Sequence, residues 1–184
     1  MKKGFSTLLA TLLLCCNSVK KKEDSSILEV SYIEKAPNLD GKASESFWSL
    51  MDWNPLDQNW IGGPYDYDDF NGRYKIAWNE QGLYLLVEVT DDVLLDKTED
   101  PLKLWWNDDC LEVFVDEDNS GGLHQYSHNA FAYHVALDGN VVDLAPDKTP
   151  KLYNDHVQSV HTTADNVTTW ELAIKVYDEN FVKG

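Results

Sequence analysis

Basic residues are scarce in this chain. Its 184 residues include 15 Lys and Arg against 32 Asp and Glu, which gives a formal net charge of −17 at pH 7. Because nucleic acids and anionic membrane surfaces are bound by clusters of Lys and Arg, this balance argues against both as partners. It is compatible with cations and with neutral ligands such as sugars. Aromatic residues, at 12%, supply enough apolar area for a single folded domain despite the charge.

Cysteine is scarce too, with only three in the chain. Two of them, Cys15 and Cys16, lie next to each other near the N-terminus. Only Cys110 is left for the remainder, which therefore forms no internal disulfide. It must be held together by core packing or by a metal. Cys110 stands in an apolar stretch, and we interpret it as a buried small hydrophobic side chain and not as a nucleophile.

The apolar stretch near the N-terminus is too short to span a bilayer. Residues 8–14 follow Lys2 and Lys3 and end at the Cys pair, an order typical of a secretory signal. The Cys pair resembles a bacterial lipoprotein signal, in which the first mature residue is a lipidated Cys. We expect a signal peptide over 1–15, a polar tether over 16–27 with lipid on Cys16, and an exported domain over 28–184 at the periplasm or cell surface. Lipidation at Cys15 and ordinary secretion without lipid are the alternatives.

From residue 28 onward, apolar residues alternate with polar ones at the period of a β-strand. Turn residues separate these segments at 79–82, 138–140 and 165–166. The pattern predicts an all-β, antiparallel β-sandwich with a two-sheet, immunoglobulin-like or jelly-roll-like architecture. One or two helical turns are expected at 44–50, with Ser44 as the N-cap. The expected strands are 73–78, 83–90, 110–116, 130–137, 141–144, 157–163 and 168–176.

Two neighbouring strands of this set carry unusual polar residues. In 110–116 one face is made of Leu and Val, while the other places Glu112 between apolar neighbours. In 130–137 one face holds only Ala side chains and His134. A hollow face that carries one carboxylate and one imidazole is a plausible ligand cleft. The alternative is that both side chains simply face solvent from the outer surface of a sheet.

Four short motifs follow one another between residues 30 and 178. They read APNLDG at 36–41 with FW at 47–48, KIAWN at 75–79 followed by LYLLVEVTD at 83–91, WNDDCLEVFVD at 106–116, and WELAI at 170–174. This ordered series resembles the family-9 carbohydrate-binding modules. The resemblance implies a β-sandwich that binds saccharides without cleaving them and that holds calcium.

By position, the resemblance assigns Trp106 to one of two Trp rings that clamp a sugar. It assigns Glu112, six residues further on, to the carboxylate that accepts sugar hydroxyls. The family pattern has Arg and Asn on the next strand, where this chain has Ala132 and His134, so bidentate Arg recognition is missing. The second clamp Trp would follow Gly184, and we expect a domain that is incomplete at its C-terminus.

Residues 116–121 read D-x-D-x-S-G, with oxygen-bearing side chains at alternate positions before a Gly. Such spacing suits a hard cation, and we expect calcium on Asp116, Asp118 and Ser120. An EF-hand is excluded because the twelfth position is Ser127 and the flanks are strands. An acidic hairpin turn without metal is the alternative. His124, His128 and His134 lack the compact spacing of a zinc site.

Two other functions are alternatives to saccharide binding. A glycosidase needs two carboxylates across the scissile bond, and Asp108, Asp109 and Glu112 are close in sequence. No set of nucleophile, base and orienting residue accompanies them, so we expect no catalysis, although the domain could be an appendage of a glycoside hydrolase. Haem binding would need a Met or His axial ligand. The candidates are Met51, His124, His128, His134, His156 and His161.

Overall fold

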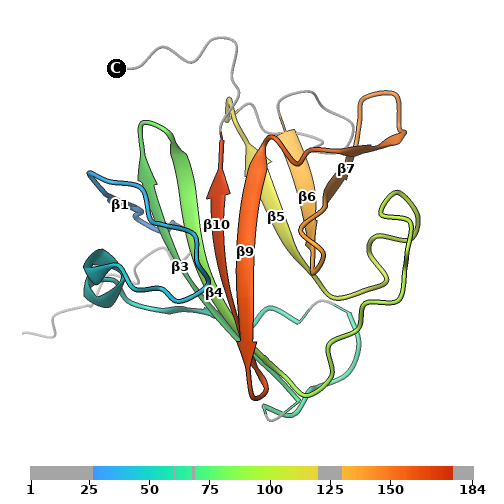
Figure 1. Cartoon of the computed structure of the whole chain (residues 1–184), viewed down its shortest axis with the longest axis horizontal. Helices are drawn as coiled ribbons and strands as arrows, with labels where there is room; N and C mark the ends of the chain where they lie inside the picture. Colours follow the sequence, from blue (N-terminus) through green and yellow to red (C-terminus); the bar gives the residue numbers. More distant parts are fainter. Residues whose placement is uncertain (1–26, 60, 68, 120–129, 176–184) are drawn as a thin grey trace, which may run out of the picture.

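Two facing β-sheets make up the structure, a computed structural model that describes residues 27–59, 61–67, 69–119 and 130–175 (Figure 1). The larger sheet has six strands in the order β1-β3-β4-β10-β9, with β2 also paired to β3. The smaller has four, in the order β5-β6-β7-β8. The larger sheet contains β1 (Ser31–Tyr32), β2 (Asn54–Leu56), β3 (Phe70–Asn79), β4 (Gly82–Asp91), β9 (Val157–Ala164) and β10 (Val167–Ile174). The smaller contains β5 (Cys110–Asp116), β6 (Ala130–Ala136), β7 (Val141–Leu144) and β8 (Pro150–Leu152).

The predicted β-sandwich is confirmed, and each strand expected from alternation is present within a few residues of its predicted ends. The pattern did not predict β1, β2 and β8, which have only two or three residues each. The expected helical turns form a 3₁₀ helix, η1 (Ser46–Leu50). The residue that precedes η1 is Glu45, so the expected N-cap at Ser44 was wrong by one position, and no side chain caps the helix.

The core lies between the two sheets. Trp170 and Leu172 of β10 and Val87 of β4 meet Tyr133 and Val135 of β6 there, and all five are buried. Because side chains alternate across a strand, the neighbours of these residues point to the opposite faces of the two sheets. In the larger sheet the opposite face is covered; in the smaller sheet it carries Glu112 and His134.

The N-terminal segment covers the far face of the larger sheet. Trp48 of η1 and Ile33 pack there on Leu86 of β4, in a second buried cluster. Lys75 of β3 is 6% exposed; its Nζ donates a hydrogen bond to the Trp48 carbonyl at 2.5 Å and lies 4.5 Å from the centre of the Trp53 ring. Only the inner face of the larger sheet is therefore available to the smaller one.

A buried carboxylate fixes this segment to the sheet. Glu171 of β10 is 1% exposed, and its Oε2 accepts hydrogen bonds from the backbone N–H groups of Asp40, at 2.8 Å, and Gly41, at 2.7 Å. The hydroxyl of Thr162 on β9 donates to the Gly41 carbonyl at 2.6 Å. The loop before η1 is thus tied to two adjacent strands.

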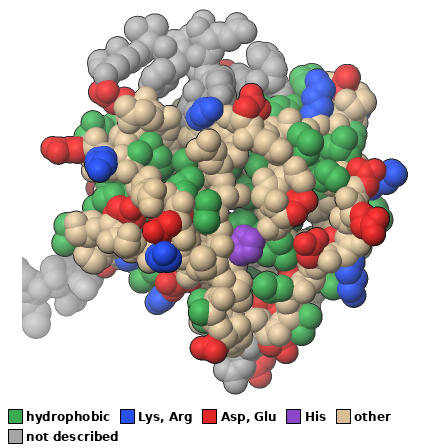
Figure 2. Space-filling model, in the orientation of Figure 1, with side chains coloured by type: hydrophobic (Ala, Val, Ile, Leu, Met, Phe, Trp, Pro, Cys, Tyr) green, Lys and Arg blue, Asp and Glu red, His purple; other side chains and the backbone are tan. Residues whose placement is uncertain are grey.

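The surface shows no concentration of basic charge on the face in view. Figure 2 shows acidic and basic side chains dispersed over that described face, with hydrophobic patches between them. None of the helices in the described part of the chain is long and apolar enough to cross a membrane.

Gly41 allows a direct test of how closely the loop before η1 packs on β9. Its φ of +71° is left-handed, and an added Cβ would lie 2.7 Å from Thr162 Cγ2. Gly139 has a similar φ of +85° with nothing within 4 Å of a Cβ, so Gly139→Ala is the matched control for backbone strain alone. We expect Gly139→Ala to lower the free energy of unfolding by about 1 kcal/mol and Gly41→Ala by about 2 kcal/mol more. Urea unfolding measures both, and equal losses would contradict the close packing at Gly41.

Candidate functional site

Glu112 and His134 lie directly opposite each other on β5 and β6. Glu112 Oε1 is 3.2 Å from His134 Nε2. His134 Nδ1 is 3.0 Å from the Ala132 carbonyl oxygen, and since a carbonyl only accepts, Nδ1 carries a proton. In the neutral ring Nε2 is therefore an acceptor, so it donates a hydrogen bond to Glu112 only when the imidazole is protonated.

Two Trp rings lie beside this pair. The Trp105 ring centre is 6.3 Å from that of His134 in an edge-to-face arrangement, and the Trp106 ring is 4.7 Å from that of Trp105. Trp106 is 55% exposed and Phe114 of β5 is 67% exposed. The side chain of Glu112 is 46% exposed, whereas that of His134 is only 16% exposed. We call Trp105, Trp106, Glu112, Phe114 and His134 the outer face.

The loop that carries both Trp residues is held by carboxylates. Asp108 Oδ2 accepts from the backbone N–H groups of Lys97, at 3.0 Å, and Thr98, at 2.6 Å, while Asp109 Oδ2 accepts from that of Leu95 at 2.6 Å. The Thr98 hydrogen bond lowers the pKa of the Asp108 carboxyl. Burial raises the pKa of the Asp109 carboxyl, and the charges of Asp91 and Asp108 raise it further. Both carboxylates position the loop, which accounts for two of the three acids in the glycosidase hypothesis.

The structure thus brings Glu112 and His134 together and connects Trp106 to them through Trp105. Sequence reasoning missed Trp105, the ring that contacts His134, because the motif spacing pointed only to its neighbour. The hollow expected beside His134 is a cavity of about 30 Å³, room for a water molecule and not for a sugar ring. A ligand of the outer face would consequently rest on exposed side chains.

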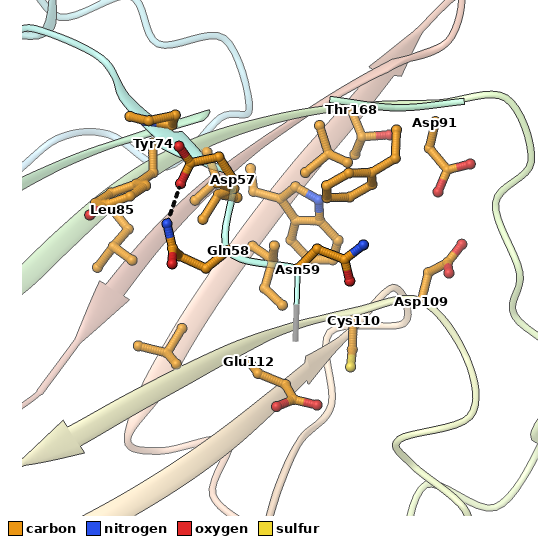
Figure 3. A pocket seen from close by; sticks show the side chains of 18 of the residues that line it. Asp57, Gln58, Asn59, Tyr74, Leu85, Asp91, Asp109, Cys110, Glu112 and Thr168 are labelled. Atoms are coloured by element: carbon orange, nitrogen blue, oxygen red, sulfur yellow. Dashed lines mark hydrogen bonds between the residues drawn. The ribbon is translucent and has the colours of Figure 1, made fainter. Parts of the chain in front are cut away.

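A larger groove, of about 840 Å³, lies between the sheets beside β5 (Figure 3). Its apolar wall comes from inner-face residues of both sheets, and Asp57, Gln58 and Asn59 lie across from Cys110 and Glu112 at its rim. Sequence patterns gave no sign of this groove, because it arises where strands far apart in the chain pack together. The apolar residues of its wall include Phe70, Tyr74, Leu85, Val87, Val89, Leu111, Val113 and Trp170.

The expected calcium ligands are only partly within the described residues. Asp116 ends β5 and is half-buried, and Asp118 is exposed in the turn that follows. Ser120, His124 and His128 lie outside the described residues, as does Cys16 with the whole of 1–26. Within the described ranges, no group of three or more His, Cys, Asp or Glu residues is placed to hold a metal ion.

The other described candidates for haem ligands, His156, His161 and Met51, all contact other side chains of the protein. His156 Nδ1 is 2.7 Å from the Tyr133 hydroxyl oxygen, and burial lowers the pKa of His156. The ring of His161 lies 4.5 Å from that of Trp170, and Met51 packs on the second buried cluster. Each of these three side chains therefore packs within the fold of the protein.

The chain belongs to the family described as carbohydrate family 9 binding domain-like, whose model matches residues 39–181. This confirms the resemblance found in the sequence. Comparison with curated proteins gives no significant match.

Two solved structures share the fold, both of a family-9 carbohydrate-binding module from Caldicellulosiruptor kristjanssonii. The complex with glucose is 19% identical with a TM-score of 0.55, and the match covers 83% of this chain and 70% of that one. The complex with cellotriose is 20% identical with a TM-score of 0.58, and covers 82% and 69%.

Cys110 is expected to be unreactive in the folded protein. Burial, followed by the charges of Glu112, Asp109 and Asp108, raises the pKa of its thiol to about 12. Relative to an ordinary thiol, roughly a thousandfold less thiolate is present near pH 8. We expect iodoacetamide at pH 8 to alkylate Cys110 at least about a hundredfold more slowly in the native protein than in urea. Peptide mass spectrometry resolves this site from Cys15 and Cys16; equal rates in both conditions would show that the thiol is accessible and ionised.

Proposed function

We propose that this domain binds a neutral saccharide at the outer face and does not cleave it. The observation that carries the proposal is the juxtaposition of an exposed Trp, an accessible carboxylate and an imidazole at one end of the β5–β6 pair. Family membership supports a carbohydrate ligand, and the two structures with the same fold hold glucose and cellotriose.

The chemistry of the outer face suits a sugar. A pyranose has an apolar C–H face that packs on an aromatic ring, and Trp106 offers one that is 55% exposed. A carboxylate accepts hydroxyl protons in charge-assisted hydrogen bonds, and the oxygens of Glu112 are reachable from solvent. A net charge of −17 disfavours anionic ligands, so a neutral saccharide is the better partner.

The use of the acids supports binding without cleavage. Asp108 and Asp109 both accept backbone hydrogen bonds within the loop, whereas the described contact of Glu112 is with the His134 ring. Hydrolysis of a glycosidic bond requires a second carboxyl group on the other side of that bond. The only Arg of the chain, Arg73, donates to Glu88 at 2.8 Å on the larger sheet and takes no part in the outer face.

Truncation of Trp106 tests the stacking role. We expect Trp106→Ala to weaken saccharide binding by about tenfold, because the aromatic platform is lost. Trp78→Ala is the matched control, since Trp78 is also exposed, at 42%, but lies on β3 of the other sheet. A panel of mono- and oligosaccharides that includes glucose and cellotriose is titrated by calorimetry. Equal losses in the two variants would remove Trp106 from the site, and a folded protein that ignores every sugar would remove the function.

Two finer parts of the proposal rest on sequence. Calcium on Asp116, Asp118 and Ser120 would stabilise the fold by about 2.7 kcal/mol at a hundredfold excess over its Kd. Thermal melting with and without a chelator tests this, and the shift should disappear in the double variant Asp116→Ala, Asp118→Ala.

Export with a lipid on Cys16 predicts that cells incorporate a labelled fatty acid into the protein and that Cys16→Ala abolishes this labelling.

A further inference from the structure

β6 and β7 pair over only part of their length. Among the described residues their register ends with His134 opposite Val142, whereas β7 goes on pairing with β8 as far as Leu144. The backbone N–H of Ala132, two residues before His134, points to the β7 side. In an antiparallel pair the N–H and C=O of one residue point to the same neighbour, so both groups of Ala132 would bond to β7 if the ladder continued. They need other partners, because backbone polar groups in a sheet rarely stay unpaired.

Two side chains supply the partners that the ladder lacks at Ala132. Asp143 of β7 accepts from the Ala132 N–H through Oδ2 at 2.9 Å, and His134 Nδ1 donates to the Ala132 carbonyl at 3.0 Å. Asp143 Oδ1 accepts from the backbone N–H of Leu144 at 2.6 Å, so each oxygen of this carboxylate has a partner that orients it. Burial raises the pKa of the Asp143 carboxyl, and the two backbone hydrogen bonds and the charge of His134 act against that rise. The carboxylate and the imidazole thus bind the same residue of β6.

The backbone of Ala132 connects Asp143 to the outer face. Because the N–H and C=O of an extended residue point to the same side, a hydrogen bond that holds the N–H also sets the direction of the C=O. That C=O accepts from Nδ1–H of His134, which leaves Nε2 of the neutral ring as an acceptor 3.2 Å from Glu112 Oε1. The Trp105 ring packs on the same imidazole, with 6.3 Å between ring centres. The position of this one imidazole therefore bears on both the carboxylate and the aromatic part of the outer face.

We propose that Asp143 is a positioning residue for the outer face: it holds Ala132 and, through that residue, keeps the His134 ring in the tautomer with its proton on Nδ1. The effect of Asp143 on ligand binding rests on the proposed saccharide function, whereas its effect on the tautomer does not. With the proton on Nδ1, the outer face presents two adjacent acceptors, Nε2 and Glu112 Oε1, to the hydroxyl groups of a ligand. In the other tautomer Nε2–H would donate to Glu112 and occupy the oxygen that a sugar hydroxyl needs. Binding groups keep such a geometry when side chains behind them fix it.

Nitrogen-15 NMR of the imidazoles tests the tautomer without any sugar. Spectra are recorded near pH 9, above the range in which imidazoles usually change charge, and the His134 signals are assigned by their loss in His134→Gln. We expect the proton on Nδ1 in the wild-type protein and in Asp143→Asn, whose side-chain oxygen still accepts from Ala132. Asp143→Ala should shift the His134 signals toward those of the Nε2–H tautomer. Asp147→Ala is the matched control, because Asp147 Oδ1 also accepts a backbone N–H, that of Thr149 at 3.0 Å, but lies in the turn after β7.

Saccharide titration of the same variants, each shown by urea unfolding to be folded, tests the consequence for binding. We expect Asp143→Ala to weaken binding at least about fivefold, roughly the value of one hydrogen bond, and Asp143→Asn and Asp147→Ala to change it less than about twofold. A wild-type ring with its proton on Nε2 overturns the proposal even if Asp143→Ala does not fold. An unchanged tautomer in folded Asp143→Ala, or equal losses of affinity in Asp143→Ala and Asp147→Ala, also overturns it. If the wild-type protein binds no sugar, the saccharide function fails, and the tautomer still decides whether Asp143 positions His134.

Discussion

The antiparallel register of β5 with β6 is the constraint on which the outer face depends. It places Glu112 opposite His134 and, one residue away, Val113 opposite Tyr133. A slip of one residue along either strand would turn that strand's polar residues into the core and its apolar ones out to solvent. The burial of Tyr133 and Val135, neither measurably exposed, therefore fixes the position of the imidazole on the other face. Packing of the inner face therefore determines which side chains are presented on the outer face.

Alternation was enough to predict the longer strands and the sandwich, because each of those strands repeats its pattern several times. It could not find β1, β2 or β8, since two or three residues do not define a period. For the same reason, alternation within each strand predicted which face of β5 carries Glu112 and which face of β6 carries His134. Their separation of 3.2 Å was not predictable, because it depends on the register between two strands joined through residues 117–129, a connection too long for a turn type to fix that register. The contact of Trp105 with His134 depends in turn on how loop carboxylates orient the chain before β5.

The acidic composition does not by itself identify a site, since the carboxylates have separate roles. Glu171 accepts from two backbone N–H groups at the N-terminal loop, and Asp108 and Asp109 accept from those of Leu95, Lys97 and Thr98. Each of these acids satisfies donors that would otherwise be unpaired, so its contribution is to the fold. Glu112 differs because its oxygens face an imidazole and solvent. Burial and donor count, which the sequence does not show, separate the structural acids from the candidate ligand-binding one.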